Sequence, residues 1–136
     1  MLDNLISDLE KYLKISLVKE ESANHTKYLL TLNDSTEIWF EQNPSGILIH
    51  SKICHFNEKE LSSPEDFYIY LSKANYLGQG TGNSIISIDP NEKFLTLSTR
   101  IAYEVNYRMF RDLIEEFVNY LSFWKKEVNK KVRVDK

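Results

Sequence analysis

Cysteine and histidine are the residues of this chain best suited to nucleophilic catalysis, and three of them fall close together as His50, Cys54 and His55. A Cys-His site needs the thiol and the imidazole within hydrogen-bond reach. In an extended strand, at about 3.3 Å per residue, His50 and Cys54 share one face but stand about 13 Å apart. His55 points to the opposite face. The spacing therefore predicts no catalytic residues, and we expect that the protein is not an enzyme.

Three of the four glycines, Gly78, Gly80 and Gly82, form a second candidate because glycine-rich loops can hold phosphate groups. Nucleotide-binding loops of this kind lead into a helix, and the phosphate loop ends in Lys followed by Ser or Thr. Here no such Lys follows and the next residues alternate as a strand does. We interpret the glycines as a flexible connector. The scattered acids lack metal-ligand spacing, so we expect no metal and no cofactor.

Length and composition predict one soluble globular domain over residues 1–136. Hydrophobic residues make up 42% and charged residues 27% of the chain, which argues against disorder, and no apolar run is long enough for membrane insertion. A net charge of −3 argues against a nucleic-acid partner. Cys54 is the single cysteine and the first residues do not resemble a secretory signal, so we expect a cytoplasmic protein.

Three amphipathic helices are predicted from apolar residues at spacings of three and four. The first covers residues 2–14 and the last, which is the longest, covers 105–128. The middle helix begins at Pro64, a residue suited to the first helical turn, and ends near Tyr76 or Leu77, where the glycines begin. The apolar stripe of each helix needs a sheet or another helix to cover it.

Strands with alternating apolar residues lie between these helices. A meander of three strands is predicted between residues 28 and 54, with turns at 33–35 and 43–46. A hairpin follows between residues 84 and 101, with its turn at 89–92. The order helix, three strands, helix, two strands, helix predicts an α+β fold in which helices cover an antiparallel sheet.

Trp39 lies in the second strand of the meander and points opposite to its neighbours Ile38 and Phe40. Either both faces of this strand are partly covered, or the tryptophan is exposed. An exposed tryptophan would indicate a binding surface, because proteins rarely leave large apolar groups in water without a partner. We therefore include Trp39 among the candidate binding residues.

The middle and end of the chain resemble the Tir-chaperone family, the small acidic class I chaperones of bacterial type III secretion. The likeness rests on the segments 70–77 (Tyr-Leu-Ser-Lys-Ala-Asn-Tyr-Leu) and 80–89, which joins a glycine turn to a strand ending in Asp89. Leu95-x-Leu97 and the last helix complete the likeness. The apolar residues of that helix are Phe110, Leu113, Phe117, Leu121 and Trp124.

The resemblance implies a bacterial cytoplasmic chaperone that binds the N-terminal segment of a secreted effector. It would keep that segment soluble and secretion-competent and deliver it to the export apparatus without ATP. It would act as a homodimer or as a heterodimer with a homologous chaperone. In the family the effector groove lies between the first helix and the sheet, so with Trp39 the effector-binding candidates are Leu5, Leu9, Leu30, Leu32, Ile38, Trp39, Phe40, Ile47 and Ile49.

Family dimers pair through the middle helix and the hairpin. The dimer-interface candidates on these elements are Phe67, Tyr70, Leu71, Ala74, Ile86 and Ile88. For each apolar position in both sets, ordinary core packing is the alternative to a binding role. The alternative for the whole protein is a small α+β ligand-binding or regulatory protein-interaction domain, and an enzyme ranks third.

Overall fold

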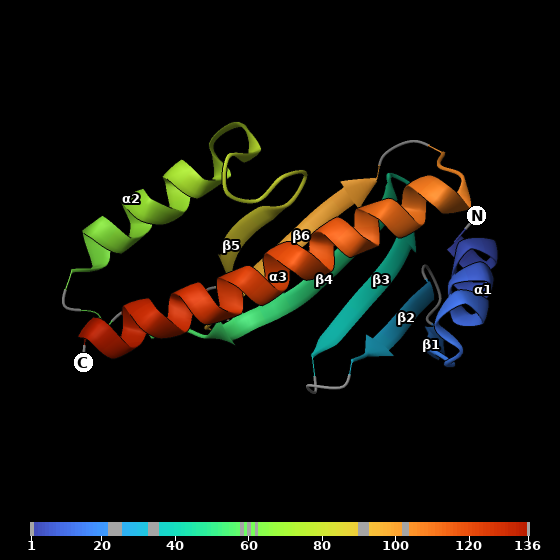
Figure 1. The fold of residues 1–136 in the computed structure, drawn as a ribbon, viewed down its shortest axis with the longest axis horizontal. Coiled ribbons are helices and arrows are strands. Elements are labelled where there is room, and N and C mark those ends of the chain that lie inside the picture. Colours follow the sequence, from blue (N-terminus) through green and yellow to red (C-terminus); the bar gives the residue numbers. More distant parts are fainter. Residues whose placement is uncertain are drawn as a thin grey trace. The chain divides into compact units, whose positions relative to one another are not determined.

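The computed structural model describes residues 2–21, 26–32, 36–57, 59, 61, 63–89, 93–101 and 104–135, with side chains as far as residue 128. Figure 1 shows its helices and strands in chain order. The helices are α1 (Leu2–Leu13), α2 (Pro64–Asn75), the short 3₁₀ helix η2 (Tyr76–Gly78) and α3 (Tyr107–Asp135). The strands are β1 (Val18–Glu21), β2 (Thr26–Thr31), β3 (Glu37–Asn43), β4 (Gly46–His55), β5 (Ile85–Asp89) and β6 (Phe94–Ile101).

The strands hydrogen bond in the order β1-β2-β3-β4-β6-β5. β1 with β2, β2 with β3, β3 with β4, and β5 with β6 are antiparallel pairs. The predicted α+β class is confirmed. The sequence-based prediction lacks β1, since its residues Val-Lys-Glu-Glu are all exposed and give no apolar alternation. These residues form a strand because they pair with β2.

The predicted boundaries of the helices are close to those observed. α1 ends one residue earlier than predicted, and α2 begins at Pro64 as the sequence indicates. α3 begins two residues later than predicted and extends to Asp135. The predicted turn at 33–35 and most of the turn at 89–92 lie outside the described residues.

The chain forms two compact units, each built from two separate stretches of sequence. Unit 1 consists of Met1–Ser51 and Thr99–Glu115, and unit 2 consists of Lys52–Ser98 and Glu116–Lys136. β4, β6 and α3 each contribute residues to both units. A single domain over residues 1–136 stays a prediction, which one cooperative unfolding transition would support.

Buried and solvent-accessible residues alternate along β2, β3 and β4 in unit 1, so one face of the sheet is buried. The buried apolar residues of β2, β3 and the unit 1 part of β4 are Tyr28, Leu30, Ile38, Phe40, Ile47 and Ile49, and within each strand they are two positions apart. α1 contributes its stripe of Leu2, Leu5, Ile6 and Leu9 to the buried set. The Phe40 ring lies 6.0 Å from that of Phe110 on α3. Unit 1 therefore has a core of its own.

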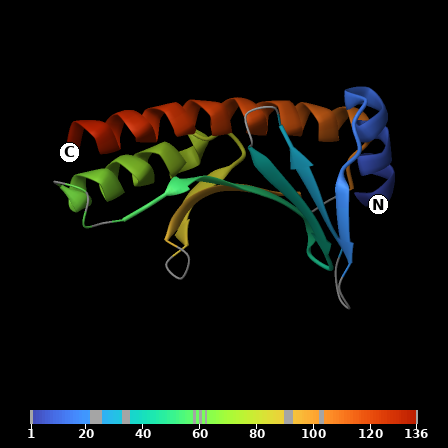
Figure 2. The ribbon, with the colours of Figure 1, turned by 90° about the horizontal axis from the view of Figure 1, so that it is seen from below.

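Unit 2 buries a second set of side chains. α2 contributes Phe67, Leu71 and Ala74, the strands contribute Ile86, Leu95 and Leu97, and α3 contributes Phe117, Leu121 and Trp124. Tyr70 of α2 packs edge-on against the Trp124 ring, with the ring centroids 5.7 Å apart. Figure 2 shows α2 running alongside the C-terminal half of α3. Both helices thus contribute apolar side chains to the core of unit 2.

The glycine segment is held against α3, which corrects its interpretation as a flexible connector. The indole nitrogen of Trp124 donates to the Gly80 carbonyl at 2.8 Å, and the Asn83 N–H donates to Glu116 at 3.3 Å. A Cβ atom on Gly82 would lie 2.0 Å from the Glu116 carboxylate. The carboxylate can move aside, but a Cβ atom would also lie 2.7 Å from the Tyr120 ring and the φ of Gly82 is +62°, so glycine is favoured at this position.

Candidate functional site

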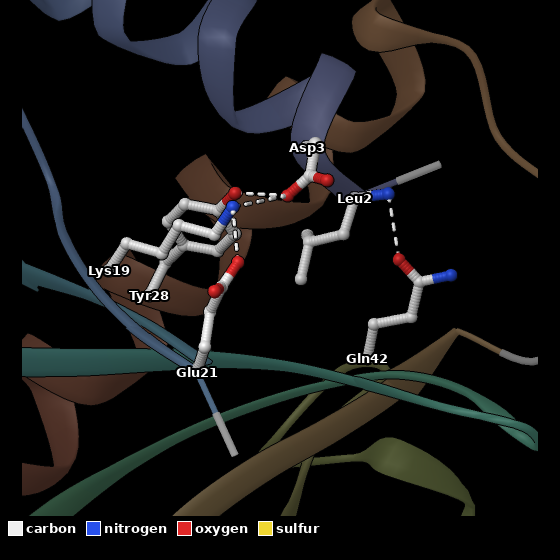
Figure 3. Close-up of polar contacts among 6 residues, drawn as sticks. All are labelled: Leu2, Asp3, Lys19, Glu21, Tyr28 and Gln42. Carbon is white, nitrogen blue, oxygen red and sulfur yellow. Dashed lines mark hydrogen bonds and ion pairs between the residues drawn. The ribbon is translucent and has the colours of Figure 1, made fainter. Parts of the chain in front are cut away.

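Polar contacts attach the N-terminal end of α1 to the sheet of unit 1 (Figure 3). The Tyr28 hydroxyl on β2 donates a hydrogen bond to the Asp3 carboxylate. Lys19 on β1 lies 3.8 Å from the same carboxylate and 2.9 Å from that of Glu21. We refer to Asp3, Lys19, Glu21 and Tyr28 as the α1 latch. It connects the first helical turn to β1 and β2, the first two strands in the strand order.

A further contact fastens the same helix end to β3. The Leu2 N–H donates to the Gln42 side-chain oxygen at 2.9 Å, which satisfies one of the N–H groups left without a partner at a helix start. Within the latch, burial and then the bond to Asp3 raise the pKa of Tyr28, so its hydroxyl stays protonated, and able to donate, further into the alkaline range. The latch therefore holds α1 against the strands at the place where the family resemblance predicts a groove.

Most of the predicted effector-binding residues lie in the core of unit 1. Seven of them are no more than 6% exposed: Leu5, Leu9, Leu30, Ile38, Phe40, Ile47 and Ile49. Leu32 and Trp39 are half-buried. The seven buried side chains can reach a partner only if the elements that cover them move. Their binding role stays a prediction, and Leu32 and Trp39 are the positions that solvent already reaches.

The opposite face of the unit 1 sheet carries a row of apolar side chains that ends at β1. By strand register Val18 lies opposite Leu29, and Leu29 opposite Trp39. Val18 is 59% exposed, and the other two are half-buried. We call Val18, Leu29 and Trp39 the outer row. The sequence pointed to Trp39 alone, because Val18 lies in a strand that the pattern does not reveal.

His50 lies opposite Trp39 on β4 and belongs to a polar cluster with Glu41 and Lys27. Its Nε2 is 2.9 Å from Glu41, and the Lys27 ammonium is 3.3 Å from that carboxylate. Burial opposes ionisation of Glu41, but His50 and Lys27 outweigh it and hold the pKa of Glu41 below its ordinary value. The outer row thus borders an ionised carboxylate at neutral pH.

Cys54 lacks the surroundings of a reactive thiol. Burial raises its pKa, which disfavours the nucleophilic thiolate. In the part of the chain that the structure describes, no three His, Cys, Asp or Glu side chains lie close enough to hold a metal ion. In those same ranges no helix is long and apolar enough to span a membrane.

The predicted dimer-interface residues mostly face the core of unit 2. Phe67, Leu71, Ala74 and Ile86 are buried, while Tyr70 and Ile88 are half-buried. The Tyr70 hydroxyl donates to Glu127 of α3 at 3.1 Å. A dimer interface formed by these six residues stays a prediction. The four buried side chains are not on the surface of this chain, where a partner could contact them.

Other apolar residues on α2, η2 and β5 are exposed instead. They are Ile69, Tyr76, Leu77 and Ile85, which we call the α2 patch. Leu77 is 84% exposed and has a φ of +50°, a backbone conformation that is uncommon for a bulky residue. The sequence signal for this patch is the seven-residue spacing of Ile69 and Tyr76, which predicts that they share a helix face. That face differs from the one that carries the buried residues of α2.

Unit 2 also contains a cavity of about 730 Å³ beside the first turn of α2. Its apolar lining includes Phe56, Leu61 and Tyr68, and its polar lining consists of Asn57, Lys59, Asp89 and Lys93. A cavity of this size with an apolar wall and these polar groups could accept a small ligand.

Two solved structures share this fold at low sequence identity. One is a chain in the crystal structure of the ExsC-ExsE complex, with a TM-score of 0.70 and 13% identity, covering 92% of this chain and 91% of that chain. The other is a chain in the HopA1-SchA chaperone-effector complex, with a TM-score of 0.69 and 8% identity, covering 92% of this chain and 93% of that chain. None of the curated proteins matches the sequence.

The sequence itself matches a protein family over most of its length. The model of the Tir chaperone protein (CesT) family matches residues 4–125, a range that runs from α1 into the second half of α3. This match confirms the resemblance inferred from the glycine turn, the following strand and the last helix. The chain therefore belongs to the Tir chaperone protein (CesT) family.

Proposed function

We propose that this protein is a type III secretion chaperone that binds the N-terminal segment of a secreted effector in the bacterial cytoplasm. It keeps that segment soluble and delivers it to the export apparatus without ATP. The observation that carries this proposal is the family match over residues 4–125, which includes the outer row and the α2 patch. The similar folds in the ExsC-ExsE and HopA1-SchA complexes support it.

Holding an unfolded segment requires contacts spread along its length, because each ordered residue loses about 1 to 2 kcal/mol of backbone entropy. The outer row offers three apolar anchors across adjacent strands, and it reaches β1 at the end of the strand order. An extended effector segment can pair with the main chain of such a strand and place side chains beside Val18. In this proposal the effector first contacts the outer row. Leu32 and the sheet residues next to α1 then enlarge the binding surface.

The second part of the proposal is a dimer formed through the α2 patch. Four exposed apolar side chains on neighbouring elements are a costly surface for a protein without a partner. A two-fold contact would cover each patch with that of the other copy. The partner is a second copy of this chain or a homologous chaperone that presents an equivalent patch.

Purification of the tagged chain from its native host tests the chaperone proposal. We expect mass spectrometry to identify a larger secreted protein that remains bound through its N-terminal segment, and we expect addition of ATP to leave the complex intact. A preparation that retains no such protein would contradict effector binding. Release on ATP addition would contradict the ATP-independent mechanism alone.

Light scattering on the purified chain tests the dimer separately. One chain has a mass of 16.0 kDa, so a particle of about twice that mass is expected at tens of micromolar. A mass of one chain, without a homologous partner in the native preparation, would contradict the dimer.

The cavity of unit 2 supports the alternative of a ligand-binding or regulatory domain. In that case a metabolite from the host would raise the melting temperature of the purified chain, since a ligand that binds only the folded state stabilises it. Replacing Tyr68 with Ala would remove the stabilisation, because this ring lines the cavity. A chaperone without such a ligand predicts the same melting temperature with and without host metabolites.

A further inference from the structure

The side chain of Asn75 forms two hydrogen bonds with a single residue of β5. Its Nδ2 donates to the Ile86 carbonyl at 2.9 Å, and the Ile86 N–H donates to its Oδ1 at 2.8 Å. Asn75 is the last residue of α2, and β5 ends the strand order of the described sheet. One side-chain amide therefore satisfies both main-chain groups of a strand residue.

The position of these bonds follows from strand geometry. In an antiparallel pair, alternate residues direct their N–H and C=O groups toward the partner strand and away from it. Ile86 lies opposite Leu97 of β6, and since both of its groups bond Asn75, they point away from β6. The amide of Asn75 thus occupies the place where a further strand would hydrogen bond to β5.

The two terminal strands of the sheet, β1 and β5, differ in how much charge they carry. Three of the four β1 residues are charged, and Lys19 is paired with Glu21. β5 has the sequence Ile-Ile-Ser-Ile-Asp, with no charge before its last residue and with Ile85 exposed. An uncharged, apolar edge strand is a site for unwanted pairing between molecules. β5 therefore needs protection of another kind.

Local packing holds Asn75 in its place. The preceding residue, Ala74, is buried, and its carbonyl accepts the Gly80 N–H at 2.8 Å. A Cβ atom on Gly80 would lie 3.1 Å from the Ala74 Cβ, so the turn after α2 closes tightly over the helix end. The amide of Asn75 is consequently presented to β5 by a packed helix end.

We propose that Asn75 closes the β5 edge and so determines how a second copy docks on this chain. A second copy makes contact through the side chains of the α2 patch, and its strands do not extend the sheet past β5. This statement about docking rests on the proposed dimer, whereas the closure of the β5 edge does not. Asn75 acts here as a positioning residue for the assembly.

Two measurements on Asn75→Ala test the proposal: hydrogen exchange of the Ile86 amide by NMR, and particle mass by light scattering. We expect exchange about tenfold faster than in the wild type, because the amide loses its partner. We also expect particles larger than those of the wild type, growing with concentration. Asn119→Ala on the exposed surface of α3 is the matched control and should change neither quantity.

The double variant Asn75→Ala, Ser87→Lys separates edge pairing from general unfolding. Ser87 is exposed on β5, and a lysine there should discourage strand pairing. We expect the wild-type particle mass to return while Ile86 exchange stays fast. Unchanged Ile86 exchange in Asn75→Ala, or an unchanged particle mass, would overturn the proposal.

Asn75→Asp covers the case in which the alanine variant does not fold. It keeps the acceptor for the Ile86 N–H but places an oxygen where Asn75 donates to the Ile86 carbonyl. We therefore expect Ile86 exchange to be faster than in the wild type by less than about tenfold, and we expect the wild-type mass because the charge also discourages strand pairing. Larger particles, or exchange faster by about tenfold or more, would overturn the proposal. If the wild type is a monomer and Asn75→Ala still assembles, the edge closure stands and the proposed dimer fails.

Discussion

The Trp124 indole donates a hydrogen bond to the Gly80 carbonyl at 2.8 Å, and the Trp124 ring is only 2% exposed. The two residues are 44 positions apart. Their contact ties the last helix to the turn between α2 and β5, the turn that also places Asn75 beside Ile86. A tryptophan late in the chain thus supports the part of unit 2 on which the proposed dimer depends.

Replacing Trp124 with Phe should lower the free energy of unfolding by about 2 to 4 kcal/mol. The variant loses part of a buried ring and leaves the Gly80 carbonyl without its donor. Denaturant melts give the value. Ser122→Ala on the exposed side of the same helix should stay within about 0.5 kcal/mol of the wild type. Equal stability of the two variants would show that the indole contact contributes little.

Gly82 and Gly78 offer a matched pair of glycine-to-alanine substitutions. Both have positive φ, +62° and +72°, so alanine strains the backbone at each by about 1 to 2 kcal/mol. Only at Gly82 does the new Cβ meet other atoms, 2.0 Å from Glu116 and 2.7 Å from the Tyr120 ring. We expect Gly82→Ala to lose at least about 1 kcal/mol more than Gly78→Ala. Equal losses of stability in denaturant melts would mean that the Glu116 and Tyr120 side chains on α3 move aside without lowering the free energy of unfolding.

Trp39 and Phe40 are neighbours on β3 that face opposite sides of the sheet. Phe40 is completely buried, so Phe40→Ala should lower the free energy of unfolding by about 3 to 5 kcal/mol. Trp39 is half-buried, so Trp39→Ala should lose about 1 to 2 kcal/mol and should weaken effector capture in a pull-down. A loss as large as that of Phe40→Ala, or undiminished capture, would remove Trp39 from the proposed binding surface.

Tyr70 should make stability depend on pH in the alkaline range. Burial, and next the hydrogen bond to Glu127, raise its pKa to about 12, above the ordinary value of about 10. The folded state therefore favours the neutral phenol. Its contribution to stability is complete below pH 10 and is lost as the pH rises toward 12.

Tyr70→Phe lacks this titration and provides the comparison. At neutral pH the variant should be about 1 kcal/mol less stable because it loses one hydrogen bond. Between about pH 10 and 12 the two stability curves should converge, since only the wild type loses the Tyr70 contribution. Curves that stay parallel over this range would show that Tyr70 ionises equally readily in the folded and unfolded states.

Short-range patterns in the sequence determined most of the secondary structure and the family. The apolar stripes of the helices and the start at Pro64 depend on local geometry, since residues three and four apart share a helix face and residues two apart share a strand face. The wrong spacing of His50 and Cys54 for catalysis is likewise a local property. The resemblance carried by the glycine turn and the late Trp124 led to the family that the match over residues 4–125 shows.

The tertiary structure alone decided which apolar residues are core and which are surface. Periodicity shows that Ile38 and Phe40 share a face, but whether other elements cover that face depends on packing between residues far apart in the sequence. The sequence pattern does not reveal β1 for the same reason, since this strand forms through its pairing with β2. Nor does it reveal the α2 patch, because the sequence-based prediction placed the interface on the buried apolar stripe of α2. The Asp3–Tyr28 and Asn75–Ile86 contacts are also long-range, because they require two elements to be placed before a polar group can find its partner.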